Sequence, residues 1–137
     1  LHVRSRRQRQ MCIRDSYKDL DEKARVADIN RPKNLKVDAT NRPRRGASAR
    51  WAVIGRSGGT CESPHCLGHS SEMTVNDEPI LEVDHLQDLA LGGSDVPVNM
   101  VALCPNCHAL KTRGKFRDWL KEELTREVEK RHWSRFY

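Results

Sequence analysis

Two short pairs of cysteines, far apart along the chain, constrain its fold more than any other feature of the sequence. They are Cys61-x4-Cys66 and Cys104-x2-Cys107. Four thiolates are the number that a closed tetrahedral zinc site requires, and paired thiols at such spacing favour metal binding over disulfides in an intracellular protein. Only 36% of the residues are hydrophobic, and a core this small usually needs a staple such as a metal. The sequence therefore predicts one structural zinc ion, with His65 and His69 as alternative ligands nearby.

The first sixteen residues need separate treatment. Arg6 to Ser16, RRQRQMCIRDS, resembles the in-frame translation of a widely used transposase sequencing adapter, and Leu1-His2 matches the adapter segment before the index barcode. We therefore interpret residues 1–16 as a non-native scar, exclude them from fold reasoning, and expect natural sequence upstream to be missing; the alternative is a natural basic arm. Their five arginines and Asp15 contribute +4 to the formal net charge of +6. The remainder carries only +2, so the alkaline pI says little about a nucleic-acid partner.

Periodicity and turn residues predict four helices and two short strands. The helices are expected over Tyr17 to Ile29, Ala47 to Arg56, Pro105 to Gly114 and Phe116 to Lys130, and a hairpin of strands over Met73 to Val75 and Ile80 to His85. In the last helix an apolar stripe is expected to face the core, and it consists of Phe116, Trp119, Leu120, Leu124 and Val128. The predicted division is a scar (1–16), a charged helix with a linker (17–46), a central domain (47–115) and a C-terminal amphipathic helix (116–137).

The segment Leu81 to His108, LEVDHLQDLALGGSDVPVNMVALCPNCH, carries the residues best suited to chemistry. Asp84 and His108 supply a carboxylate and an imidazole that can hold a divalent cation. His85 carries an imidazole, the side-chain group that most often accepts a proton from an attacking water. Asn99 can fix the His85 ring or join the metal ligands. Each residue alone has an ordinary structural explanation, but all four in this order around a CxxC favour a metal site.

These residues resemble the HNH endonuclease family, whose fold is a ββα-metal finger. The resemblance covers roughly Trp51 to Lys115 and is specific in LEVDH, in the GGSD loop before Asn99 and in ALCPNCH. It implies an α+β fold with flanking helices and a four-cysteine zinc. It also implies that Asp84 and His108 are ligands of a catalytic metal, that His85 is the general base and that Asn99 is the asparagine of the motif. Members with such a zinc include restriction-type and phage nucleases, and the segment between Cys66 and Ile80 looks most like restriction-type members that cut modified DNA.

The sequence departs from some members of the family at Thr112. Those members carry a third histidine one helical turn after the position of His108. Threonine is a poor ligand for a soft metal, so the resemblance implies an oxygen-rich site served by magnesium or manganese, with water or Asn99 completing the coordination.

The functional hypothesis is hydrolysis of phosphodiester bonds in DNA, with RNA as an open alternative substrate. The phosphate contacts are predicted to come from basic residues after His108, namely Lys111, Arg113, Lys115 and Arg117. The alternatives are a zinc-stapled module that binds nucleic acid without catalysis and a structural zinc module that binds protein. No apolar run reaches the length of a membrane span, and we expect a cytoplasmic protein without a membrane partner. The sequence does not predict an oligomeric state.

Overall fold

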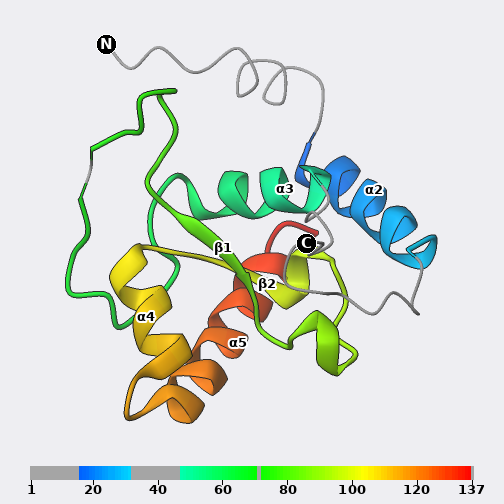
Figure 1. The fold of residues 1–137 in the computed structure, drawn as a ribbon. Coiled ribbons are helices and arrows are strands. Elements are labelled where there is room, and N and C mark those ends of the chain that lie inside the picture. The colour runs from blue at the N-terminus through cyan, green and yellow to red at the C-terminus, as the bar shows by residue number, and fades with distance from the viewer. Residues whose placement is uncertain (1–15, 32–46, 71, 137) are drawn as a thin grey trace.

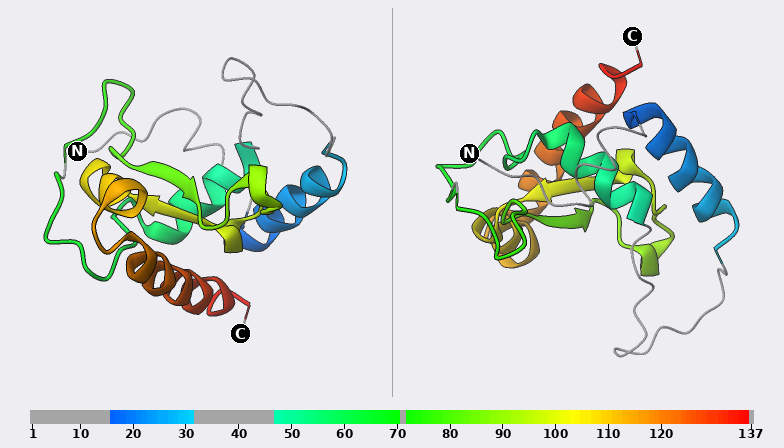
Figure 2. Two further views of the ribbon diagram at one scale, coloured as in Figure 1. Left: turned by 60° about the horizontal axis from the view of Figure 1, so that its bottom comes forward. Right: turned by 90° about the horizontal axis from the view of Figure 1, so that it is seen from above.

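The computed structural model describes residues 16–31, 47–70 and 72–136. The chain forms α2 (Tyr17–Ile29), α3 (Ala47–Ser57), β1 (Glu82–His85), the 3-10 turns η1 (Leu89–Leu91) and η2 (Pro97–Asn99), β2 (Met100–Leu103), α4 (Pro105–Arg113) and α5 (Arg117–Trp133). In Figure 1 the two strands run between α3 above and α4 and α5 below, and α2 and α4 lie at opposite ends of the molecule, as they do in both views of Figure 2. The predicted α+β fold is confirmed. The adapter-like segment lies outside the described residues except for Ser16, which caps α2.

The sheet differs from the predicted hairpin. β1 pairs with β2 in antiparallel register from Glu82 opposite Leu103 to His85 opposite Met100. The predicted strand at Met73 to Val75 is wrong, because this segment makes only an isolated bridge between Met73 and Pro79 and closes on itself as a turn. The apolar run of β2 is buried at every position, so it takes the place beside β1 that the polar segment cannot fill.

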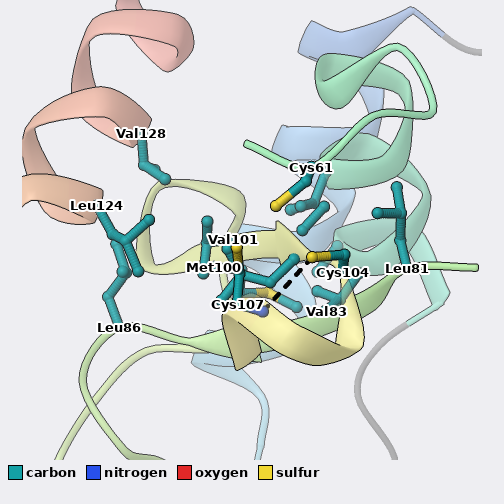
Figure 3. Close-up of a cluster of buried hydrophobic side chains, with 14 of the residues drawn as sticks. Cys61, Leu81, Val83, Leu86, Met100, Val101, Cys104, Cys107, Leu124 and Val128 are labelled. Carbon is teal, nitrogen blue, oxygen red and sulfur yellow. Dashed lines mark hydrogen bonds between the residues drawn. The ribbon is translucent and has the colours of Figure 1, made fainter. Parts of the chain in front are cut away.

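The core surrounds β2. Its four residues pack with the buried Ala49 and Val53 of α3, and with one stripe of α5 that consists of Leu120, Leu124 and Val128 (Figure 3). The predicted stripe on α5 was too wide, since Phe116 and Trp119 are 69% and 50% exposed. Spacing by four residues places Leu120, Leu124 and Val128 on one face, and Phe116 lies before the first turn of the helix.

A buried ion pair connects this core to the loop before β2. Arg56 of α3 makes two hydrogen bonds with Glu62, of 2.7 and 2.9 Å, and both side chains are fully buried. The same guanidinium donates to the carbonyls of Pro97 and Met100, on either side of Asn99. Burial alone would lower the pKa of Arg56, but Glu62 raises it above its ordinary value. The pair therefore fixes the position of the segment that carries Asn99.

Among the described residues, none of the helices combines the length and the apolar character that a bilayer crossing requires.

Candidate metal centres

The four cysteines come together at the junction of β2 and α4. Their Sγ atoms all lie within 4.8 Å of one another, and the Sγ atoms of Cys66 and Cys104 are 3.9 Å apart. Zinc–sulfur bonds of about 2.3 Å in a tetrahedron place sulfur atoms about 3.8 Å from one another. Cys104 is the N-cap of α4, and its Sγ accepts a hydrogen bond of 3.4 Å from the Cys107 N–H. The cluster thus has the donors and the spacing of a structural zinc site.

The environment of these thiols differs from one cysteine to the next. Burial and the neighbouring thiols raise the pKa of Cys107 far above its ordinary value. Burial also acts to raise the pKa of Cys104, but the Cys107 N–H and the adjacent thiols reverse that effect and lower it. One thiol of the cluster thus ionises more readily than its neighbours, and a metal that binds there would convert the others to thiolates as well.

The two alternative ligands lie at the edge of the cysteine cluster. His69 Nδ1 is 4.0 Å from Cys66 Sγ. His65 instead stacks on Trp119 of α5, with ring centroids 4.7 Å apart, and its Nε2 lies 3.7 Å from a carboxylate oxygen of Glu123. The four cysteines already supply a complete tetrahedral set, so neither histidine is needed as a ligand.

The second centre is a groove between β1 and α4, with a volume of about 750 Å³. Alternation along β1 turns Glu82 and Asp84 toward this groove and buries Val83 and His85 behind it. The helix rotates by about 100° per residue, so Cys107 faces the thiols while His108 faces the groove. Neighbouring residues of α4 therefore belong to different centres.

His108 lies between two carboxylates. Its Nδ1 is hydrogen-bonded to Glu82 Oε2, and its Nε2 lies 3.3 Å from Asp84 Oδ2. Because a carboxylate oxygen accepts, Glu82 keeps a proton on Nδ1, so Nε2 is the ring atom that a metal beside Asp84 would bind. Glu82 was not singled out from the sequence, although it stands in LEVDH, two residues before Asp84. Period-two alternation was the signal that could have placed both carboxylates on one face.

Lys111 closes this cluster. Its Nζ donates to Asp84 Oδ2 at 2.7 Å, and the lysine side chain is only 9% exposed. Burial alone would raise the pKa of Asp84, but Lys111 and, to a smaller extent, His108 lower it below its ordinary value. Asp84 is therefore a carboxylate at neutral pH, as a metal ligand must be. The structure places Lys111 on Asp84 rather than on the open surface where a phosphate contact was predicted.

His85 does not line the groove with the other two. It is 6% exposed, and its Nε2 lies 2.8 Å from Asp95 Oδ1. Asp95, which the sequence analysis did not single out, is the last residue of the quoted GGSD loop. The structure therefore brings Asp84 and His108 together, and it places His85 on the other side of β1 with a carboxylate partner of its own.

Asn99 holds the loop between His85 and Asp95 rather than the His85 ring. Its Oδ1 accepts from the Gln87 N–H at 3.0 Å, and its Nδ2 donates to the carbonyls of Gln87 and Ser94 at 3.0 and 2.7 Å. A Cβ at Gly93 would lie 2.0 Å from the Gln87 carbonyl oxygen, so only glycine lets the loop close in this way. Asn99 and Gly93 together bring the two ends of the loop into contact.

The remaining predicted contacts lie at the rim. Arg113 and Arg117 line the groove and are exposed, while Lys115 is exposed but does not line it. Thr112 lines the groove, and its hydroxyl donates to the His108 carbonyl at 2.9 Å. Among the described residues, the groove thus offers two close ligand atoms for a cation, from Asp84 and His108, beside two arginines that suit a polyanion.

The separation of those two ligand atoms fits a shared divalent ion. A metal–oxygen or metal–nitrogen bond of about 2.1 Å places neighbouring ligands about 3 Å apart in an octahedral shell. One imidazole and one carboxylate in a solvent-open groove leave several positions for water or substrate oxygen.

Comparisons with known proteins agree with this geometry. Residues 61–114 match the family model described as HNH endonuclease. They form an HNH endonuclease domain. The chain is 44% identical, over 57 residues, to the Type IV methyl-directed restriction enzyme EcoKMcrA of Escherichia coli strain K12, and this alignment covers 41% of the chain and 20% of that enzyme. The Type IV phosphorothioation-dependent restriction endonuclease ScoMcrA superposes with a TM-score of 0.78 at 43% identity, over 88% of this chain and 23% of that structure. The chain therefore spans about a fifth to a quarter of the length of these relatives, and the HNH endonuclease resemblance predicted from LEVDH, GGSD and ALCPNCH is confirmed.

Proposed function

We propose that this chain is the nuclease part of a restriction-type enzyme and hydrolyses phosphodiester bonds in DNA with the help of a divalent metal ion. The observation that carries the proposal is the pairing of His108 Nε2 with Asp84 Oδ2, 3.3 Å apart, at the wall of an open groove in an HNH domain. A carboxylate whose pKa is lowered and an imidazole whose Nδ1 is held by Glu82 are suitable ligands for magnesium or manganese.

Each residue of the site has a separate task in this proposal. Asp84 and His108 would hold the metal, and a metal bound there would stabilise negative charge on the phosphate and on the leaving oxygen. His85 would keep the role of general base that the family resemblance implies. Its ring is buried behind the groove with Asp95 on Nε2, so this role requires Nδ1 to reach the attacking water once metal and DNA are bound. Asn99 would act as a positioning residue, because its amide bonds only the backbone around the loop.

The polyanion would lie along the rim of the groove. Arg113 and Arg117 are exposed there and can pair with phosphate oxygens, and Lys115 extends the basic edge. Lys111 would contact a phosphate only after its ion pair with Asp84 is broken. The names of the two relatives mention methyl-directed and phosphorothioation-dependent restriction, so modified DNA is the substrate class that we propose to test first, with RNA as the comparison.

The zinc of the cysteine cluster would support the fold and stay outside the reaction. The described cysteines carry free thiols, which are available to a metal in a reducing compartment, and we include cytoplasmic action in the proposal. The predicted division into residues 17–46, 47–115 and 116–137 also stays a proposal.

A plasmid-nicking assay with magnesium or manganese tests the function. The wild-type chain should convert supercoiled plasmid to nicked or linear forms, and His85→Ala should reduce the rate by a factor on the order of 100 or more, because a general base contributes about 10²–10⁴ to the rate. His65→Ala, which removes an exposed imidazole that does not line the groove, serves as the control and should cut at the wild-type rate. A wild-type protein that binds DNA without cutting would instead support the non-catalytic zinc module, and unchanged cutting by His85→Ala would refute the assigned base.

A further inference from the structure

The carboxylate that contacts His85 is itself held from outside the HNH domain. Asp95 Oδ1 lies 2.8 Å from His85 Nε2, and the Asp95 N–H donates to Asp28 Oδ1 of α2 at 3.0 Å. Arg31, which follows α2, donates to the Gly93 carbonyl at 3.4 Å and pairs with Asp28 at 3.3 Å. The C-terminal end of α2 is thus hydrogen-bonded to the loop at Gly93 and at Asp95, on either side of Ser94.

These contacts are sheltered from solvent. The side chains of His85 and Asp95 are 8% and 12% exposed, and those of Asp28 and Arg31 are 18% and 23% exposed. Hydrogen bonds and ion pairs of this kind are less screened by salt than surface pairs and hold a narrower geometry. The arrangement is therefore suited to fixing the orientation of a side chain rather than only to covering the surface.

Helix α2 is itself packed against the rest of the protein. Leu20 and Ala24 are buried, and the Tyr17 hydroxyl is 2.7 Å from His132 Nδ1 of α5. Helix α2 nevertheless lies outside residues 61–114, which carry the HNH match. An element from outside the family region thereby determines the position of a loop inside it.

The direction of the hydrogen bond decides what Asp95 does to the imidazole. A carboxylate oxygen accepts, so the ring must donate from Nε2, and in the neutral ring the lone pair then lies on Nδ1. Within the described part of the chain, Nδ1 of His85 makes no hydrogen bond. Asp95 therefore selects the tautomer in which Nδ1 can take up a proton, as carboxylates paired with catalytic histidines do.

We propose that α2 is a positioning element for His85, and that Asp28 and Arg31 act through Asp95 to hold the imidazole in one tautomer and one orientation. This inference rests on the proposed function in so far as it assigns His85 to catalysis. Movement of α2 away from the loop would release Asp95 and leave the ring free to change tautomer. The segment that precedes the HNH domain would in this way control its reactivity without contacting substrate.

The test uses the full chain with zinc bound and compares Asp28→Ala with Glu22→Ala, which removes an exposed carboxylate from the same helix. Asp28→Ala should lower kcat for plasmid cutting about tenfold, in the range of lost supporting hydrogen bonds at metal and catalytic histidines, while the KM for DNA and the zinc content stay unchanged. Asp28→Asn keeps an oxygen that can accept from the Asp95 N–H and should recover most of the rate. Glu22→Ala should behave as the wild type.

A second measurement does not depend on activity. Ring ¹⁵N chemical shifts of His85 at one fixed pH should show the Nε2–H form in the wild type and a mixture of tautomers in Asp95→Ala and Asp28→Ala. A wild-type ring pattern and kcat in Asp28→Ala would overturn the inference and leave the nuclease function standing. Absence of cutting by the wild type would instead overturn the proposed function, and the NMR comparison would still decide the inference. If Asp28→Ala does not fold, the same two measurements are made on Arg31→Met. This substitution removes the hydrogen bond to the Gly93 carbonyl and keeps the one between Asp28 and the Asp95 N–H.

Discussion

The two candidate metal centres differ in how much the stability of the fold depends on them. Three of the four cysteines are buried, and Cys61, Cys104 and Cys107 belong to the same core cluster as Val83 and Leu103. In the groove the side chains of Asp84 and His108 are 18% and 31% exposed, and their neighbours are charged. A centre built into the core contributes to folding, whereas one built on the wall of a groove can lose its metal without losing the core.

The two centres nevertheless share helix α4, and β1 connects the groove to the core. Helix α4 carries Cys107 toward the thiols and His108 toward the groove, and β1 carries Val83 into the core and Asp84 into the groove. A change in the cysteine cluster must therefore disturb the groove, because it removes the anchor of α4. A change confined to the groove should instead leave the core and the cysteine cluster intact.

Removing a zinc ligand should have the largest effect. Cys104→Ser takes away one thiolate and the sulfur that caps α4, and binding energies of about 10–16 kcal/mol for structural zinc exceed or match the ~5–15 kcal/mol that stabilises a typical domain. We expect loss of the zinc and of cooperative unfolding, measured by metal analysis and by circular dichroism during heating. A folded Cys104→Ser protein without zinc would contradict the scaffold role of the cluster.

Two matched glutamate substitutions, one near each centre, should differ in the same direction: the one near the cysteine cluster should lose more unfolding free energy. Glu62 follows the first zinc ligand and is fully buried against Arg56, while Glu82 is 48% exposed beside His108. Glu62→Gln leaves a buried guanidinium without its counter-ion and should cost about 3 kcal/mol or more in unfolding free energy. Glu82→Gln should cost less than about 1 kcal/mol.

The same pair should reverse its order when metal binding is measured. Glu82 holds the His108 proton on Nδ1, so Glu82→Gln should weaken manganese binding to the zinc-loaded protein by about tenfold in a calorimetric titration. Urea unfolding of both variants supplies the stability comparison. Equal losses of stability in the two variants would show that the groove is as much a part of the core as the cysteine cluster is.

The sequence predicted most of the fold because the deciding signals are local. Pro105 and Gly114 bracket α4, and the cysteine spacing brings two distant segments together through one ion. The pairing of β1 was missed because strand pairing depends on distant residues: β2 is a short apolar run inside a segment that reads mainly as loop. Local periodicity cannot say which run will meet Glu82 to His85.

The sequence pointed to the side chains that meet in the groove but not to the contacts that support them. Asp84 and His108 could be named from their chemical types and spacing, and they meet in the groove. Asp95 and Asp28 could not, because a carboxylate in a loop or at a helix end has no pattern that tells which histidine or amide it will face. Such partners emerge only when the loop from Gln87 to Asn99 closes in three dimensions.

An effect of similar size but opposite sign is expected from a second residue of the groove, Lys111. Lys111 places an ammonium on Asp84 Oδ2, the oxygen that also faces His108, so a divalent ion bound there must displace or repel it. Lys111→Met removes that competing charge and should tighten manganese binding about tenfold, equivalent to ~1.4 kcal/mol. Lys121→Met, an exposed lysine on the same groove, is the control and should change the affinity less.

The same variant has a signature in the pH dependence of stability. Lys111 lowers the folded-state pKa of Asp84 below its value in the unfolded chain, so the unfolded state binds the proton more readily. The stabilisation from this pair is complete above the unfolded-state pKa of about 3.9 and is lost as the pH falls through the folded-state pKa. Between pH 6 and pH 3 the wild type should therefore lose more unfolding free energy than Lys111→Met in urea titrations. Equal losses of unfolding free energy in the two proteins, together with unchanged manganese affinity, would mean that Lys111 does not control the protonation of Asp84. Lys111 would then not compete with a metal ion for this carboxylate.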